Sequence, residues 1–205
     1  MFLCLFFLLF AQEQELKIER ILNKNSKPEE RIEIAKKYKD VDIEIKEPLK
    51  ILIKTNKGEI LCELYPQYAP KTVKNFVKLS KLGFYDGLIF HRYVPDFVIQ
   101  GGDPYGTGYG NAGYNIPLEV NEKAKHVEGA LGIARAQDPN SGSCQFYITL
   151  KETPHLDGNY TVFGKVIKGM DVVKKLRKGD IIEKIEIMED TQKIKMKEKV
   201  KNVEK

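Results

Sequence analysis

The sequence has no tryptophan and only three cysteines, Cys4, Cys62 and Cys144, among its 205 residues. The cysteines form no C-x-x-C pair and show no other spacing typical of metal ligands, so no metal site is expected. If Cys4 is removed with a leader peptide, an even pair remains. The sequence leaves open whether Cys62 and Cys144 form a disulfide or stay as two buried free thiols.

A long hydrophobic run is also missing. Residues 2–11 are almost purely apolar, but this run is far shorter than the roughly 20 residues that span a bilayer. Its length matches the apolar core of a secretory signal, although the usual basic start is absent. We predict that residues 1–11 are a signal peptide and that the mature protein is exported, periplasmic or secreted, without stable membrane insertion. The alternatives are a buried N-terminal helix or a misread start, in which case the protein is cytoplasmic.

Positive charge is concentrated at one end of the chain. The formal net charge is +5, and residues 193–205 hold six lysines and two glutamates, which leaves the rest of the chain close to neutral. A short lysine-rich end is usually solvated, and nucleic-acid binding by such an end is the less common alternative. We therefore assign residues 190–205 to a lysine-rich tail and expect no nucleic-acid partner.

Length and composition fit one globular domain, assigned to residues 48–189, with extensions. Residues 12–47 are charged and favour helix, and Ser26 before Pro28 is typical of a helix start. The apolar residues near helical spacing are Leu16, Ile18, Ile21 and Leu22. We predict a helical extension over 12–47, which is either a partner-binding arm or a solvated spacer or packing helix.

From Leu49 the apolar pattern becomes that of strands. Residues 51–53 and 59–64 are joined by Asn-Lys-Gly, which predicts a hairpin, and Pro70 to Gly83 brackets an amphipathic helix. Further short strands are predicted at residues 129–136, 145–150, 161–166 and 181–188, and a short helix at 170–176. Many short strands with two helices favour a mainly β protein, a closed or nearly closed barrel with helical caps.

Residues 90–113 combine a strand-like segment, a Gln-Gly-Gly-Asp turn and a glycine-rich run. Such a run has no side-chain core of its own, so a rigid scaffold must hold it. The side chains of Arg92, Phe97 and Gln100 are expected to face one surface. We interpret that surface as a pocket for a peptide segment that contains proline.

Three segments in this order make the chain resemble a cyclophilin, a peptidyl-prolyl cis-trans isomerase. They comprise residues 90–108 with Phe-His-Arg and Gln-Gly-Gly-Asp, residues 134–149 with Ala-Arg-Ala and Gln-Phe-Tyr-Ile-Thr, and residues 156–173 with Leu-Asp-Gly and Val-Phe-Gly-Lys-Val. The resemblance covers about two-thirds of the chain. It implies an eight-stranded antiparallel closed β-barrel capped by two α-helices, here with an N-terminal helical extension. It also implies isomerisation of X–Pro bonds in proline-containing polypeptides without a cofactor, and we expect a monomer.

The chemistry of that reaction requires a fixed hydrogen-bond donor, which Arg92 can supply. Rotation about an amide bond has a barrier of ~18–20 kcal/mol because resonance gives the bond double-bond character. In the twisted state the prolyl nitrogen regains a lone pair, and a fixed donor aimed at it binds that state more strongly than either planar state. Arginine stays charged and presents rigid donors. We predict that Arg92 is the catalytic donor and that Gln100 helps to place it.

The resemblance also implies the residues around the substrate. The proline ring is expected in a pocket made by Phe97, Val98, Tyr147, Leu156 and Tyr160. Ala134, Arg135, Ala136, Gln145 and His91 are expected to line the peptide groove. Val98, Tyr147 and Tyr160 differ from the family's frequent methionine, phenylalanine and histidine, and His155 stands where strong cyclosporin binders have tryptophan. These departures imply a slightly more polar pocket and weak cyclosporin sensitivity.

Other functions have weaker support. The chief alternative is a proline-segment binding module or chaperone with little turnover, and Arg92 speaks against it because binding alone needs no donor under the imide nitrogen. Residues 108–113 match G-x-G-x-x-G, but Pro117 follows where a nucleotide site needs a helix. A hydrolase triad of Ser143, His155 and Asp157 lacks a nucleophile elbow.

Overall fold

The computed structural model describes residues 18–188 and 194–196. Their main feature is one curled antiparallel sheet of eight strands. In spatial order the strands are β4 (Phe90–Val94), β5 (Val98–Gly101), β7 (Phe146–Thr149), β6 (Ala130–Ile133), β8 (Val162–Lys168), β3 (Gly58–Leu64), β2 (Leu49–Thr55) and β9 (Ile182–Met188). The other elements are α1 (Pro28–Lys37), α2 (Pro70–Leu82), α3 (Met170–Lys175), a 3₁₀ turn (Pro154–Leu156) and a small sheet of β1 (Ile43–Ile45) with β10 (Ile194–Met196).

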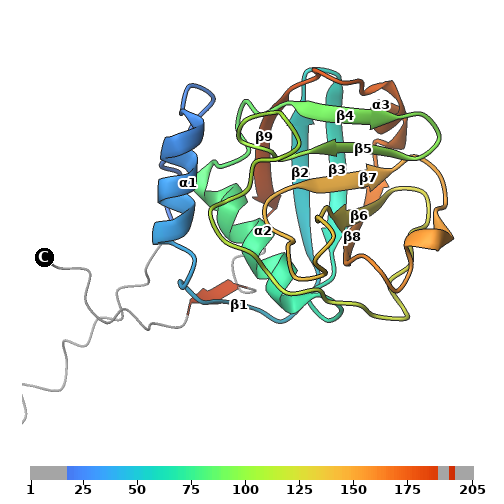
Figure 1. Ribbon diagram of the computed structural model, residues 1–205, viewed down its shortest axis with the longest axis horizontal. Helices are drawn as coiled ribbons and strands as arrows, with labels where there is room; N and C mark the ends of the chain where they lie inside the picture. Colours follow the sequence, from blue (N-terminus) through green and yellow to red (C-terminus); the bar gives the residue numbers. More distant parts are fainter. Residues whose placement is uncertain (1–17, 189–193, 197–205) are drawn as a thin grey trace, which may run out of the picture.

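Curling brings the two edges of the large sheet together at one end. In Figure 1 the strands β4, β5 and β7 run across the view, in front of β9, β2 and β3. Ile89 and Ile181 form an isolated antiparallel bridge, and Phe90 N donates to Asp180 O at 2.8 Å. Strands β4 and β9 do not otherwise pair. The mainly β, eight-stranded antiparallel architecture is therefore confirmed, and the closed barrel is an approximate description of it.

The core lies inside the curled sheet and under α2. Alternation puts Phe146 of β7 inward, where its ring lies 5.3 Å from Phe76 of α2 and 5.6 Å from Tyr85, each pair edge to face. Helix α2 begins at Pro70 and ends at Leu82, with Gly83 as its C-cap, as the sequence predicts. Gly83 has φ +81°, a left-handed conformation that suits glycine at a helix end.

The N-terminal extension is less helical than predicted. Only α1 is helical between residues 18 and 47, and residues 18–27 are irregular. The near-helical spacing of Ile18, Ile21 and Leu22 predicted a helix that does not form here. The backbone N–H groups of Ile21 and Leu22 instead donate to Leu82 O at the end of α2. The predicted signal peptide and nearly all of the predicted tail lie outside the described residues and stay predictions.

Arg31 of α1 fixes this extension to the domain. Its side chain is 2% exposed, and its guanidinium donates to five backbone carbonyls. These belong to Asn23, Ser26, Gly83, Phe84 and Asp86. One side chain thus connects the irregular arm, α1 and the turn after α2. Burial lowers the pKa of Arg31, with Asp86 and Glu30 acting in the opposite direction.

The described residues resolve two smaller questions. Cys62 and Cys144 are both buried free thiols, so the disulfide alternative is excluded in this structure. In the ranges 18–188 and 194–196, none of the helices has the length and apolar character needed to cross a bilayer.

We predict that Arg31→Met strongly destabilises the protein. Methionine fills similar space but leaves buried carbonyls without their donor, which should lower the free energy of unfolding by about 3 kcal/mol. Urea denaturation measures this change. Lys37→Ala, at an exposed position of the same helix, is the control. A loss below about 1 kcal/mol for Arg31→Met would contradict the importance assigned to these hydrogen bonds.

Candidate active site

Strand register places four residues in one row across the outer surface of the sheet. Arg92 of β4 is opposite Gln100 of β5, Gln100 is opposite Tyr147 of β7, and Tyr147 is opposite Gly132 of β6. The Tyr147 ring covers Gly132 so closely that a Cβ there would lie 2.3 Å from Tyr147 Cζ. The missing side chain at Gly132 therefore makes room for the ring that forms the floor of the site.

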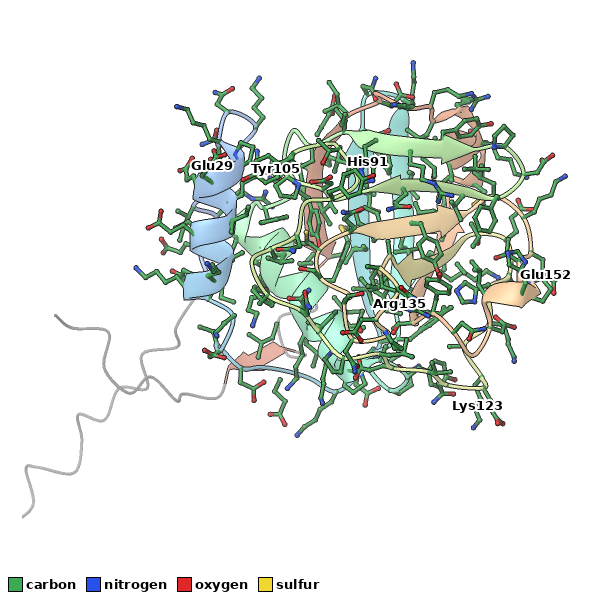
Figure 2. All side chains as sticks on the ribbon, viewed as in Figure 1. Glu29, His91, Tyr105, Lys123, Arg135 and Glu152 are labelled. Atoms are coloured by element: carbon green, nitrogen blue, oxygen red, sulfur yellow. The ribbon has the colours of Figure 1, made fainter. Side chains whose placement is uncertain are left out.

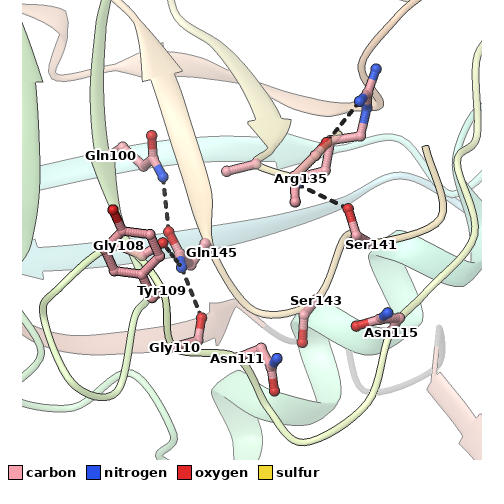
Figure 3. A pocket seen from close by; sticks show the side chains of 12 residues that line it. Gln100, Gly108, Tyr109, Gly110, Asn111, Asn115, Arg135, Ser141, Ser143 and Gln145 are labelled. Carbon is pink, nitrogen blue, oxygen red and sulfur yellow. Dashed lines mark hydrogen bonds between the residues drawn. The ribbon is translucent and has the colours of Figure 1, made fainter. Parts of the chain in front are cut away.

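A directional series of hydrogen bonds leads to Arg92. Gln145 Nε2 donates to the carbonyls of Gly108 (2.9 Å) and Gly110 (2.8 Å), as Figure 3 shows. Its Oε1 accepts from Gln100 Nε2 at 2.8 Å, and Gln100 Oε1 accepts from Arg92 Nη1 at 3.2 Å. Carbonyls only accept, so they fix the orientation of Gln145, then of Gln100, and finally offer Arg92 an oxygen. We refer to Gln145 and Gln100 as the amide pair.

Arg92 and Gln100 border a pocket of about 180 Å³. Its other lining residues are Phe97, Val98, Ala134, Arg135, Tyr147, Leu156 and Tyr160. The structure thus brings together nine of the twelve predicted site residues. Two of its aromatic walls are held by neighbouring side chains: the Phe97 and His155 rings stack with centroids 5.5 Å apart, and Arg135 Cζ lies 4.4 Å from the Tyr160 ring centroid.

A second pocket of about 410 Å³ continues from the first and shares Gln100, Ala134 and Arg135 with it. Ala136 and Gln145, two further predicted residues, line this second pocket. The Arg135 guanidinium donates to the carbonyls of Ala136 and Asn159, so its side chain holds the rim in place. Together the two pockets form a continuous groove with an aromatic end and a polar end.

His91 does not line either pocket, contrary to the prediction from the resemblance. It points behind the site, 6% exposed and beneath Gly108, because its neighbour Arg92 occupies the outward face of β4. Neither ring nitrogen has a hydrogen-bond partner in the described part of the chain. Burial lowers the pKa of His91, and Asp103 only partly opposes this, which keeps the ring neutral near pH 7.

Asp103 was not among the predicted site residues, yet it shapes the loop that carries Gly108 and Gly110. Its buried carboxylate accepts from four backbone N–H groups, those of Tyr105, Thr107, Gly108 and Gly110. Burial alone would raise the pKa of Asp103, but these N–H groups outweigh it and lower the pKa. An aspartate directly before a glycine-rich run was the available signal.

A hydrogen-bonded pair behind the pocket floor, made of buried His126 and part-exposed Asp157, was also missed. His126 is 1% exposed, its Nδ1 lies 2.8 Å from Asp157 Oδ1 and its Nε2 lies 2.8 Å from the Tyr147 hydroxyl. Burial lowers the pKa of His126 despite Asp157, so the neutral ring donates to Asp157 and accepts from Tyr147. His126 and Asp157 are 31 residues apart, and nothing local in the sequence relates them.

Two rival sites are not assembled. Asp157 contacts His126 rather than His155, and the Ser143 hydroxyl donates to Tyr114 O. The G-x-G-x-x-G run at residues 108–113 continues as irregular chain without a helix. The geometry supports neither the hydrolase triad nor the nucleotide site.

Comparisons with known proteins agree on one family. Residues 50–203 match the family model for cyclophilin type peptidyl-prolyl cis-trans isomerases. A peptidyl-prolyl cis-trans isomerase of Helicobacter pylori is 46% identical over 153 residues, which are 73% of this chain and 93% of that protein. A cyclophilin type peptidyl-prolyl cis-trans isomerase of Cryptosporidium parvum superposes with a TM-score of 0.67 at 35% identity, over 70% of this chain and 99% of that one. A structure of the latter determined in the presence of the dipeptide Ala-Pro superposes with a TM-score of 0.60, also at 35% identity, over 73% of this chain and 99% of that one.

The two buried histidines predict how stability depends on pH. Both have a folded-state pKa below the ordinary 6.5, so below that pH the unfolded chain binds more protons than the folded one. The contribution of these two histidines to the free energy of unfolding is therefore fully present above about pH 6.5. It is lost on acidification, by up to about 1.4 kcal/mol per pH unit for each histidine. The lowered pKa values of Asp103 and Asp157 add losses only at lower pH.

Urea denaturation between pH 7 and 5 measures this effect. We expect the free energy of unfolding to fall by about 1 kcal/mol or more, with a shallower slope in His91→Gln. A flat profile in this range would show that both histidines titrate normally in the fold.

Proposed function

The chain belongs to the cyclophilin-type peptidyl-prolyl cis-trans isomerases, and from this premise we propose that Arg92 is its catalytic donor. The resemblance inferred from the sequence is confirmed by the family match and by the relatives. The chain is accordingly an isomerase of X–Pro peptide bonds. The observation that supports the role of Arg92 is its position: it borders an aromatic pocket and is hydrogen-bonded to the amide pair.

Catalysis requires no covalent step. The unaided rotation takes tens to hundreds of seconds because the planar amide is stabilised by resonance. At the twisted geometry the prolyl nitrogen becomes a hydrogen-bond acceptor. A donor that meets it only there lowers the barrier without binding either planar form more tightly, and each ~1.4 kcal/mol gives about tenfold in rate.

Arg92 suits this task because its guanidinium is restrained by its neighbours while most of its N–H donors stay free for the substrate. One N–H of Nη1 donates to Gln100 Oε1, and the Arg92 carbon Cζ lies 5.8 Å from the Phe97 ring centroid. A guanidinium carries five N–H donors. Several therefore stay available to a substrate, in a plane that Gln100 and Phe97 restrict.

The two pockets divide the substrate between a fixed and a moving part. The smaller pocket, with Phe97, Leu156 and Tyr160 among its walls, accepts the proline ring, and the larger one accepts the residues on the acyl side. Holding the ring converts rotation into movement of the acyl segment over Gln100. The relative studied in the presence of Ala-Pro supports a proline peptide as the ligand of this site.

We predict that Arg92→Ala lowers kcat/KM on a proline-containing tetrapeptide about a hundredfold, because the twisted nitrogen loses its donor. Exchange NMR or a coupled isomerisation assay measures the rate, and peptide titration measures binding, which should change little. Lys123→Ala is the control, because Lys123 is exposed and lines neither pocket. Equal catalysed rates for Arg92→Ala and wild type would overturn the role assigned to Arg92, and only rates that both equal the uncatalysed rate would identify a proline-binding module or chaperone.

A further inference from the structure

The segment of residues 18–45 lies outside the family match, which begins at residue 50, yet it is part of the same packed structure. Leu22, Ala35, Ile43 and Ile45 are between 1% and 6% exposed and belong to the main core cluster. Figure 1 shows α1 beside the domain, on the side of α2 away from the strand β7. The extension is therefore packed on the domain through buried side chains.

Residues 18–27 pack closely against the turn after α2, with no room for a side chain at two glycines of the turn. A Cβ at Gly83 would lie 2.2 Å from Leu22 O, and a Cβ at Gly87 would lie 2.8 Å from Lys24 Cα. Both glycines also have positive φ. Arg20 adds an ion pair with Asp86, and Arg31 donates to carbonyls on both sides of the contact. These contacts hold α1 in one position.

Helix α1 in turn presses on the glycine-rich loop, residues 104–113. A Cβ at Gly113 would lie 2.8 Å from Lys36 Cγ and 2.9 Å from Ile32 Cγ2, so the loop backbone packs directly against the helix. Glu29 and Tyr105 lie side by side at the other end of this contact (Figure 2). Partial desolvation and then the Glu29 carboxylate raise the pKa of Tyr105.

The loop needs such support because of its composition. Four of the eight residues from 106 to 113 are glycine, so ordering this backbone costs more conformational entropy than ordering an average segment. On the inner side, N–H groups of the loop donate to the Asp103 carboxylate. Helix α1 contacts it from the outside, and the carbonyls of Gly108 and Gly110 between them orient Gln145.

We propose that α1 is an intramolecular brace for the active site, with Ile32 and Glu29 as positioning residues. By restricting the glycine-rich loop, α1 keeps the carbonyls of Gly108 and Gly110 where they orient the amide pair, and so the guanidinium of Arg92. The inference rests on the proposed role of Arg92. It assigns the N-terminal extension a role in turnover rather than only in stability.

The test is a double-mutant cycle in the full chain. Ile32→Ala removes one of the two α1 side chains that pack on Gly113, the other being Lys36, without weakening helix propensity. It should lower kcat about fivefold, an effect of the size seen for coupled positions outside a site. Gln145→Met removes the amide through which the effect passes. In the Gln145→Met background, Ile32→Ala should change kcat by less than twofold, because the two substitutions interrupt the same connection.

Two further readouts separate positioning from general destabilisation. All assays are run well below the measured Tm, and Glu33→Ala, at an exposed position of α1, should leave kcat unchanged. In Ile32→Ala, amide hydrogen exchange at Gly108 and Gly110 should accelerate about tenfold while the amides of β7 keep their protection. Tyr105→Phe, which removes the hydroxyl beside Glu29, should reproduce the effect on kcat in the same direction with a smaller size.

The outcomes are distinguishable. Unchanged kcat in both Ile32→Ala and Tyr105→Phe, or an equal loss from Ile32→Ala with and without Gln145, would overturn the brace. An isomerase insensitive to Arg92→Ala would instead overturn the proposed function, and the loop exchange rates would still report whether α1 restrains the loop.

Discussion

The site depends on the direction of one series of hydrogen bonds. Primary amides are ambiguous components, because each can donate or accept and can flip. Two backbone carbonyls, Gly108 O and Gly110 O, remove this ambiguity at Gln145, and the consequence passes through Gln100 to Arg92. A guanidinium placed in this way faces the pocket with its remaining donors, without needing an anionic partner that would compete with the substrate nitrogen.

This dependence explains why a loop with little side-chain packing of its own is held so firmly. The Asp103 carboxylate accepts hydrogen bonds from the N–H groups of the loop, and α1 packs on the outer side of the loop. Below the floor of the pocket, the Tyr147 hydroxyl is satisfied by His126, which is satisfied by Asp157. A tyrosine in this apolar floor is therefore compatible with proline binding, because its polar atom is paired behind the pocket and not left toward the substrate.

The sequence predicted most of what depends on local pattern. Pro70 and Gly83 marked the two ends of a helix correctly. The proximity of Arg92, Phe97 and Gln100 followed from their strand and turn. Features that depend on distant contacts were not predictable in this way: His126 contacts Asp157 from 31 residues away, and Arg31 donates to carbonyls of two separate segments. His91 is a different case, because strand alternation alone places it on the face opposite to Arg92, whereas the resemblance had placed it in the groove. The extension was predicted as more helical than it is, since Leu82 O accepts the N–H groups of Ile21 and Leu22.

The central claim, that the amide pair orients Arg92 for turnover, is tested most directly by Gln100→Met. Methionine keeps the length and volume of glutamine but can neither accept from Arg92 nor donate to Gln145. Exchange NMR at saturating proline peptide measures kcat, and titration measures the dissociation constant. The account predicts that kcat falls about tenfold, equal to ~1.4 kcal/mol of transition-state stabilisation, with binding changed less than twofold. An unchanged kcat, or a loss confined to binding, would contradict it.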